Sequence, residues 1–294
     1  MDHTAEEPHV TVGRAPAVDP NTPLQVIEPQ KGWVGINWGE IWRYRELLYF
    51  LTWRDVKIRY KQTVLGAAWA ILQPLLTVLI FSVIFGQVAK FQEHTGGVPY
   101  SIYAYAAMLP WMFFQNAIHS SSNSLVGSSN LITKVYFPRL SIPLAAVGAG
   151  LVDLAISSGV FFVMLLVFHP VFTWGLLATP LLLIGTVLLA TGVGTLLSAL
   201  TVEFRDFRYV VPFMVQLWMY ATPVIYPPEI VPARWQFLYQ LNPLVGLVGG
   251  FRSALLGLDF QWGQIGFSFL LSLAFFLGGA AYFRAVERRF ADVI

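Results

Sequence analysis

The chain has 294 residues, of which 56% are hydrophobic and only 12% are charged, and its mean hydropathy is +0.62. Soluble domains carry about 25% charged residues, so this composition indicates an integral membrane protein. The net charge of +2 argues against nucleic acid as a partner, and the absence of Cys excludes disulfides, thiol catalysis and Cys-ligated metals.

The N-terminal stretch, residues 1–38, is polar and rich in Pro. A cleaved signal peptide would need an apolar segment after a basic start, and this stretch has none. We therefore expect a flexible tail on the cytoplasmic side of the membrane.

The next segment, 39–62, precedes the first long apolar stretch. Leu48, Leu51 and Ile58 recur at helical spacing beside a stripe of charged residues, which predicts an amphipathic helix in the membrane interface. Two roles are open for its cations. They can anchor the helix to anionic lipid, and they can guide a phosphate-bearing headgroup to a lateral entrance; the two roles are compatible. The headgroup candidates are Arg54, Lys57, Arg59 and Lys61.

Six apolar stretches follow, and each predicts a transmembrane helix because about 20 apolar residues cross a bilayer. They are 65–88, 102–122, 140–168, 174–200, 209–226 and 262–283. The Pro-rich segment between the last two predicts short re-entrant periplasmic helices that enter the membrane without crossing it. Gly192 and Gly194, in the fourth predicted span, allow a neighbouring helix to approach closely.

The distribution of Lys and Arg predicts the orientation of these spans. With the N-terminus in the cytoplasm, thirteen Lys and Arg near the membrane fall inside, and only Lys90, Arg234 and Arg252 fall outside. Because short cytoplasmic loops carry the excess of positive charge, both termini are predicted to be cytoplasmic.

The loop between the second and third spans carries an apolar cluster on the predicted cytoplasmic side. A Ser/Asn cap precedes the cluster and Pro138 ends it, which predicts a short helix. An exposed apolar cluster fits a helix that docks into a partner, and the alternative is a seam packed against the chain's own bundle. The docking candidates are Asn130, Leu131, Ile132, Lys134, Val135, Tyr136 and Phe137.

Aromatic and amide side chains occur inside the spans as well as at their ends. Amides at membrane depth usually face a bundle interior, whereas most aromatics face lipid or form interfacial belts. Aromatic faces would also let a sugar polymer slide, because they contact its C–H groups without holding it by strong hydrogen bonds. The channel-lining candidates are Trp69, Gln73, Phe114, Phe213, Gln216 and Tyr220. Asp153, an acid at membrane depth in the third span, is predicted to make a helix contact.

The sequence contains no GxxxxGK[ST], HExxH or GxSxG motif and no pair of His residues at metal-ligand spacing. We therefore predict that the chain is not an enzyme and binds no cofactor or metal. The predicted fold is an all-α integral membrane protein with six transmembrane helices, an interface helix, a cytoplasmic coupling helix and short re-entrant helices.

Several segments together resemble one family, the permease subunits of ABC-2 type transporters that export polysaccharides. They are RDVKIRYKQTVLGAAW (54–69), LQPLL (72–76), LPWMFF (109–114), NSLVGSSNLITKVYFPR (123–139), YVVPFMVQLWMYATPVIY (209–226) and LNPLVGLVGGF (241–251). The resemblance covers residues 40 to 290, roughly the predicted transmembrane domain 39–294.

The resemblance implies a homodimer in the bacterial inner membrane, in contact with membrane lipid and with two copies of an ABC ATPase that binds ATP and Mg. It implies that residues 130–137 contact the ATPase and that 54–61 flank a lateral entrance. The implied substrate is a lipid-linked polysaccharide such as O-antigen on undecaprenyl diphosphate, exported to the periplasm through an aromatic-lined channel between protomers.

Other functions stay open at this point. A teichoic-acid or capsule exporter, or an ABC-2 drug or lipid exporter, would share most of these features. An ion-coupled secondary carrier would need paired intramembrane acids, and Asp153 alone is poor support for one. A membrane scaffold would leave the re-entrant segment unexplained.

Overall fold

The computed structural model describes residues 38–61, 68–134, 137–168 and 173–290. The predicted tail, 1–38, lies almost wholly outside these ranges. The α-helices are α1 (Trp38–Arg43), α2 (Arg45–Lys61), α3 (Ala68–Phe81), α4 (Tyr100–Gly127), α5 (Ser129–Lys134), α6 (Ser141–Phe168), α7 (Thr179–Glu203), α8 (Phe207–Tyr220), α9 (Gln236–Gln240), α10 (Pro243–Leu256) and α11 (Trp262–Val286).

Shorter helical turns join these helices, and the described residues form no strand. They are the π-helical turn η1 (Ser82–Val88) and the 3₁₀ turns η2 (Phe91–His94), η3 (Trp174–Ala178), η4 (Pro228–Ile230), η5 (Ala233–Trp235) and η6 (Glu287–Arg289). The expected all-α class is confirmed for the described part of the chain.

Four stretches of the described chain are long and apolar enough to cross a membrane. They are Ile71–Val88, Ser141–Phe168, Trp174–Glu203 and Trp262–Arg289. They coincide with the first, third, fourth and sixth predicted spans, which indicates an integral membrane protein.

The second and fifth predicted spans coincide with α4 and α8; α4 is long enough to cross a membrane but less apolar than the four stretches, and α8 is too short. The 28 residues of α4 make it about 42 Å long at a rise of ~1.5 Å per residue, but polar side chains such as Gln115 and Asn116 lower its hydropathy. The 14 residues of α8 are fewer than the ~20 that a bilayer needs. Most of α4 is buried among α6, α7 and α10, so protein rather than lipid covers many of its polar groups.

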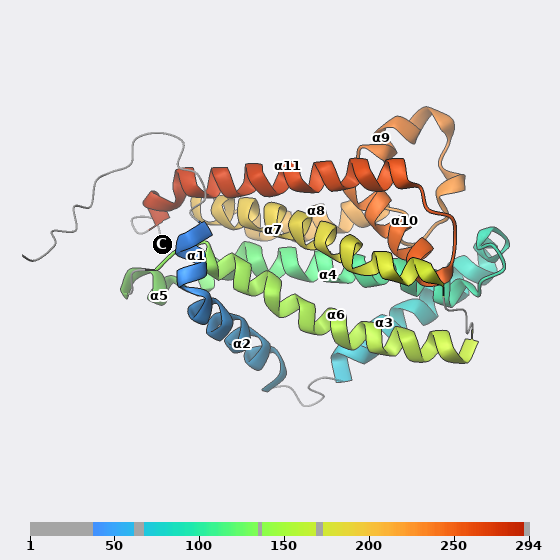
Figure 1. The fold of residues 1–294 in the computed structure, drawn as a ribbon, viewed down its shortest axis with the longest axis horizontal. Helices are drawn as coiled ribbons and strands as arrows, with labels where there is room; N and C mark the ends of the chain where they lie inside the picture. The colour runs from blue at the N-terminus through green and yellow to red at the C-terminus, as the bar shows by residue number, and fades with distance from the viewer. Residues whose placement is uncertain (1–37, 62–67, 135–136, 169–172, 291–294) are drawn as a thin grey trace, which may run out of the picture. The chain divides into compact units, whose positions relative to one another are not determined.

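The long helices form one bundle. In Figure 1, α4, α6, α7 and α11 run alongside one another, α5 lies at one end of the bundle, and α9 and α10 lie at the other. α7 packs against both α11 and α4, while α6 packs against α4 and carries α2 on another side.

The contact between α7 and α11 depends on two glycines. A Cβ atom on Gly192 would overlap the backbone of Phe275 and Phe276, and a Cβ atom on Gly279 would overlap the carbonyl of Gly192. The close approach that the sequence predicts at Gly192 is therefore confirmed, and the two backbones touch at this point.

The predicted interface helix, 39–62, is divided into α1 and α2 by a turn at Tyr44. Leu51 is buried, whereas Ile58, which the helical pattern placed on the same apolar stripe, is 64% exposed. α2 packs along α6, so a helix contact, and not interface depth alone, determines which of its residues are buried.

A compact apolar cluster, the end cluster, lies where α5 meets the bundle. Its buried members are Leu51, Leu125, Ile132, Phe137, Leu140, Ile142, Ala145, Ala199, Val202, Phe283 and Phe290. The end cluster therefore joins α2 and α5 to the neighbouring ends of α4, α6, α7 and α11.

The Pro-rich segment between α8 and α11 holds short helices, of which α10 is the longest. Asn242 caps α10 by accepting a hydrogen bond from the backbone N–H of Leu244, and it also accepts one from the Trp218 indole at 2.9 Å. Arg252, which the charge distribution places outside the cytoplasm, is 2% exposed inside α10, so it is buried in the bundle and does not lie on an open loop.

We predict that Gly279→Ala lowers the stability of the protein by about 1–3 kcal/mol, because the added methyl group has to push α7 and α11 apart. Thermal unfolding of the purified protein in detergent measures the effect. Gly278→Ala is the matched control, since nothing lies within 4 Å of a Cβ atom at Gly278. Equal melting temperatures for the two variants would contradict the proposed contact.

Candidate functional site

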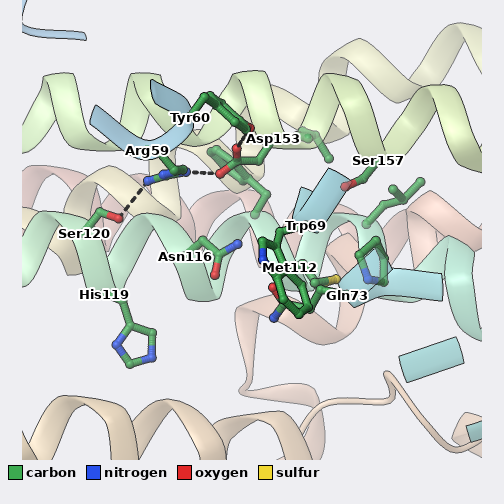
Figure 2. Close-up of a pocket in the computed structure, with 14 residues that line it drawn as sticks. Arg59, Tyr60, Trp69, Gln73, Met112, Asn116, His119, Ser120, Asp153 and Ser157 are labelled. Carbon is green, nitrogen blue, oxygen red and sulfur yellow. Dashed lines mark hydrogen bonds and ion pairs between the residues drawn. The ribbon is translucent and has the colours of Figure 1, made fainter. Parts of the chain in front are cut away.

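A pocket of about 370 Å³ opens between α2, α3, α4 and α6, and we call it the polar pocket. Figure 2 shows its lining side chains. They are Arg59, Tyr60, Trp69, Gln73, Pro74, Leu109, Met112, Phe113, Asn116, His119, Ser120, Asp153, Leu154 and Ser157. Pockets of this size are large enough for a small ligand or for part of a larger one.

Helical periodicity brings these residues together. On α4, Met112, Asn116 and Ser120 recur every four residues and therefore share one face. The same spacing relates Trp69 to Gln73 in α3, and Asp153 to Ser157 in α6. The pocket is thus formed by matching faces of separate helices.

An ion pair lies on one side of the polar pocket. The guanidinium of Arg59 donates from Nη1 to Asp153 Oδ2 and from Nη2 to Ser120 Oγ at 3.1 Å. The hydroxyl of Tyr60 donates to the other carboxylate oxygen of Asp153 (Figure 2). These contacts tie α2 to α4 and α6, which confirms that Asp153 makes a helix contact.

The ion pair leaves the pocket close to electrically neutral. The side chains of Arg59 and Asp153 are 31% and 16% exposed, so each charge is largely removed from solvent and compensated by the other. The remaining polar groups are amides, hydroxyls, an indole and the half-buried imidazole of His119. The pocket therefore suits a ligand that needs hydrogen bonds and an aromatic face more than it suits an isolated anion.

The headgroup candidates do not all reach this pocket. Arg59 lines it, whereas Arg54 pairs with its neighbour Asp55 at 2.9 Å and is 41% exposed. Lys57 and Lys61 are exposed on α2. Exposed cations such as these remain available to a charged lipid surface.

The channel-lining candidates fall into three groups. Trp69 and Gln73 line the polar pocket. Phe114 is fully buried, and its ring meets that of Trp218 edge-on with 5.1 Å between centroids, so it belongs to the core of this chain. The other three, Phe213, Gln216 and Tyr220, are exposed on α8.

The side chains of the α5 segment are less exposed than the sequence predicts. The expectation of an exposed apolar cluster is wrong for Ile132 and Phe137, which are 6% and 5% exposed and pack into the end cluster. Leu131 also packs against that cluster. The exposed residues of α5 are polar: Asn130, Thr133 and Lys134. Two further docking candidates, Val135 and Tyr136, lie outside the described residues.

Sequence reasoning missed Tyr60, Ser120 and His119 as pocket residues. The four-residue recurrence of polar groups along α4 was the available signal for Ser120. Among the described residues, no group of three or more His, Cys, Asp or Glu is arranged to hold a metal ion.

Residues 46–256 match the family model described as ABC-2 type transporter. The chain belongs to the ABC-2 type transporter family. The match begins within α2 and ends at the last residue of α10, so all residues of the polar pocket and of α5 lie inside it.

Named relatives extend the similarity. The chain is 28% identical over 254 residues to the O-antigen export system permease protein RfbA of Klebsiella pneumoniae, covering 85% of this chain and 95% of that one. It is 27% identical to RfbA of Myxococcus xanthus over 73% of this chain and 82% of that one. It is also 21% identical to the polysialic acid transport protein KpsM of Escherichia coli, over 69% and 78% of the two chains.

We predict that Arg59→Gln and Asp153→Asn each destabilise the protein by about 1–3 kcal/mol, because each leaves the other charge largely buried without its counterion. The double variant should lose less than the sum of the two. Thermal unfolding of the four proteins completes the double-mutant cycle.

Arg54→Gln is the matched control, since its ion pair is more exposed and should contribute less than about 1 kcal/mol. Strictly additive losses for Arg59→Gln and Asp153→Asn would show that the two side chains are not coupled.

Proposed function

We propose that this chain is the permease subunit of an ATP-driven exporter that moves a lipid-linked polysaccharide across the bacterial inner membrane, from cytoplasm to periplasm. The observation that carries the proposal is the similarity to O-antigen export permeases, which covers 85% of this chain and 95% of the Klebsiella pneumoniae protein. The similarity to a polysialic acid transport protein favours a polysaccharide substrate and makes capsule polymer the second candidate.

The proposed topology has six spans with both termini in the cytoplasm. α4 is long enough to cross the bilayer, and the helices around it cover many of its polar groups. α8 is shorter, and we infer that the residues following Tyr220 complete its crossing. The excess of Lys and Arg on one side of the predicted spans supports the orientation.

The proposed channel lies between two copies of the chain. Along α8, Tyr209, Phe213, Gln216 and Tyr220 recur at helical spacing, and all four are exposed in the single chain. Phe213 and Tyr220 are 61% and 59% exposed in the single chain, so their rings are accessible to a second protomer and to a polymer that passes between the two. Aromatic rings present C–H and π surface to sugar rings without fixing them in place.

The polar pocket is proposed to flank the entrance for the lipid-linked glycan. Lys57 and Lys61 on the same helix as Arg59 would attract a carrier diphosphate such as that of undecaprenyl diphosphate. Trp69 and Gln73 would then meet the first sugar units. The polar pocket is close to electrically neutral, which supports the proposal that it meets sugar units while the exposed lysines meet the diphosphate.

The energy is proposed to come from two copies of an ABC ATPase, which would bind ATP and Mg. α5 is the proposed contact because it lies at one end of the bundle (Figure 1). Its exposed side chains are polar, as suits a surface that meets a soluble partner. Its buried side chains belong to the end cluster, so movement of α5 would reach the ends of the long helices.

Gene deletion with complementation tests the proposed function. In the deletion strain, surface polysaccharide should be lost and lipid-linked polymer should accumulate inside the cell, because synthesis continues without export. Immunoblotting of the surface fraction and analysis of the extracted lipid-linked polymer measure both effects. Surface polysaccharide that persists unchanged in the deletion strain would refute the proposal.

Trp69→Ala is predicted to reduce surface polysaccharide several-fold, since it removes the aromatic face of the polar pocket. Trp174→Ala is the matched control: Trp174 is 89% exposed, and it lies outside the polar pocket. Both variants are compared at equal protein levels in the membrane. A similar defect in both, or in neither, would count against a role for this pocket in export.

Lys134→Glu is predicted to weaken the association with the ATPase, because it reverses an exposed charge on α5. The amount of ATPase that copurifies with the permease from native membranes measures the association. Arg234→Glu reverses an exposed charge on η5, beside α9, and should leave copurification unchanged. Unchanged copurification for Lys134→Glu would remove the support for α5 as the contact.

A further inference from the structure

A second pocket, of about 320 Å³, lies at the end of the bundle formed by α9 and α10, and we call it the far pocket. It is lined by η2 and the residues after it, α4, η4, α9, α10 and the start of α11. It shares no lining residue with the polar pocket. The proposed function, which places a substrate at the entrance and in the channel, leaves the far pocket without a role.

Arg252 is the most unusual residue of the far pocket, because it is 2% exposed and its hydrogen-bond acceptors are all neutral. Its guanidinium donates to the carbonyl oxygen of Val224 at 2.7 Å and to the carbonyl and hydroxyl oxygens of Tyr103, both at 3.3 Å. It also stacks 4.0 Å from the centroid of the Tyr103 ring. Among the described residues, no carboxylate lies within ion-pair distance of Arg252.

Tyr239 supplies a second buried polar group to the same pocket. Its hydroxyl oxygen is buried and has no hydrogen-bond partner among the described residues. Burial raises the pKa of Tyr239, so the hydroxyl remains protonated and can both donate and accept. Buried hydroxyls in folded proteins nearly always have a partner, which makes this group a candidate to bind a ligand.

The remaining lining groups indicate the chemistry of that ligand. Glu229 and Asp259 line the pocket and are exposed, and their carboxylates would repel a phosphate or another anion. Gln261 and Gln264 add amide groups that donate and accept. A pocket that combines a cation, carboxylates, amides and tyrosines matches a ligand with many neutral hydroxyl groups.

One glycine leaves space for this ligand on a face of α10. Gly249 lines the far pocket, and nothing lies within 4 Å of a Cβ atom built on it. A larger side chain at this position would therefore fill the pocket without forcing the helices apart.

We propose that the far pocket is a saccharide subsite that binds a neutral sugar unit of the exported polymer on the side of the membrane where the polymer emerges. The proposal rests on the proposed function for the substrate and for the direction of transport. Tyr239 and Arg252 hydrogen-bond sugar hydroxyls as donors, and Glu229 and Asp259 accept from them. The polymer would thus be held at the exit as well as at the entrance.

Binding to the full-length permease with its ATPase, reconstituted in nanodiscs, tests the subsite. The probe is an oligosaccharide cut from the cells' own surface polysaccharide, and titration calorimetry measures its affinity. Gly249→Leu should weaken binding at least about tenfold by filling the pocket, and Tyr239→Phe should weaken it severalfold by removing one hydroxyl. Gly278→Leu, which adds the same side chain at an open position on α11, should bind as the wild type does.

The outcomes separate the subsite from the proposed function. If gene deletion abolishes surface polysaccharide but Gly249→Leu and Tyr239→Phe bind the oligosaccharide normally, the subsite is refuted and the export function stands. If deletion leaves the surface polysaccharide intact, the export function fails, and the subsite fails with it. Inorganic diphosphate serves as a competitor: displacement of the oligosaccharide from the wild-type protein by diphosphate would identify an anion site and overturn the saccharide assignment.

Discussion

The close contact between α7 and α11 is the constraint on which the rest of the bundle depends. Helices in a membrane gain little by burying apolar side chains against one another, because acyl chains are equally apolar. Direct backbone packing at Gly192 and Gly279 therefore contributes to holding this pair together, beside the hydrogen bond from the Tyr282 hydroxyl to Glu203. α7 also packs against α4, and α4 against α6, so this contact helps to position α4, the helix that contributes more residues to the polar pocket than any other.

Polar contacts fix what close packing does not. Asp153 accepts from both Arg59 and Tyr60, so α2 is joined to α6 by charge-assisted hydrogen bonds as well as by packing. At the other end of the bundle, Arg252 connects α10 to α4 through Tyr103. The polar pocket and the far pocket thus each have a guanidinium in their lining. That of Arg59 pairs with a carboxylate, whereas that of Arg252 is hydrogen-bonded to neutral oxygens.

Much of the fold could be predicted from hydropathy, and the departures have physical reasons. Four of the six predicted spans are strongly apolar because lipid-facing helices must be apolar on most of their surface. The second predicted span, 102–122, coincides with α4, whose lower hydropathy is tolerated because neighbouring helices cover many of its polar side chains. Arg59, Trp69 and Gln73 were each identified singly, but hydropathy carries no information on which helices touch. The pairing of Arg59 with Asp153, 94 residues away, therefore needed the structure. Ile132 was expected on the surface because a loop's own pattern cannot reveal the cluster that covers it.

The anchoring of α5 has a mechanical consequence. Ile132 and Phe137 are held among side chains from the ends of α2, α4, α7 and α11, and close-packed interiors resist compression. A force applied to the exposed face of this six-residue helix would therefore be shared by several helix ends at once instead of being lost in a flexible loop. Since each long helix is stiff along its axis, a shift at the end cluster would tilt whole helices, and their opposite ends, beside α10, would move with it.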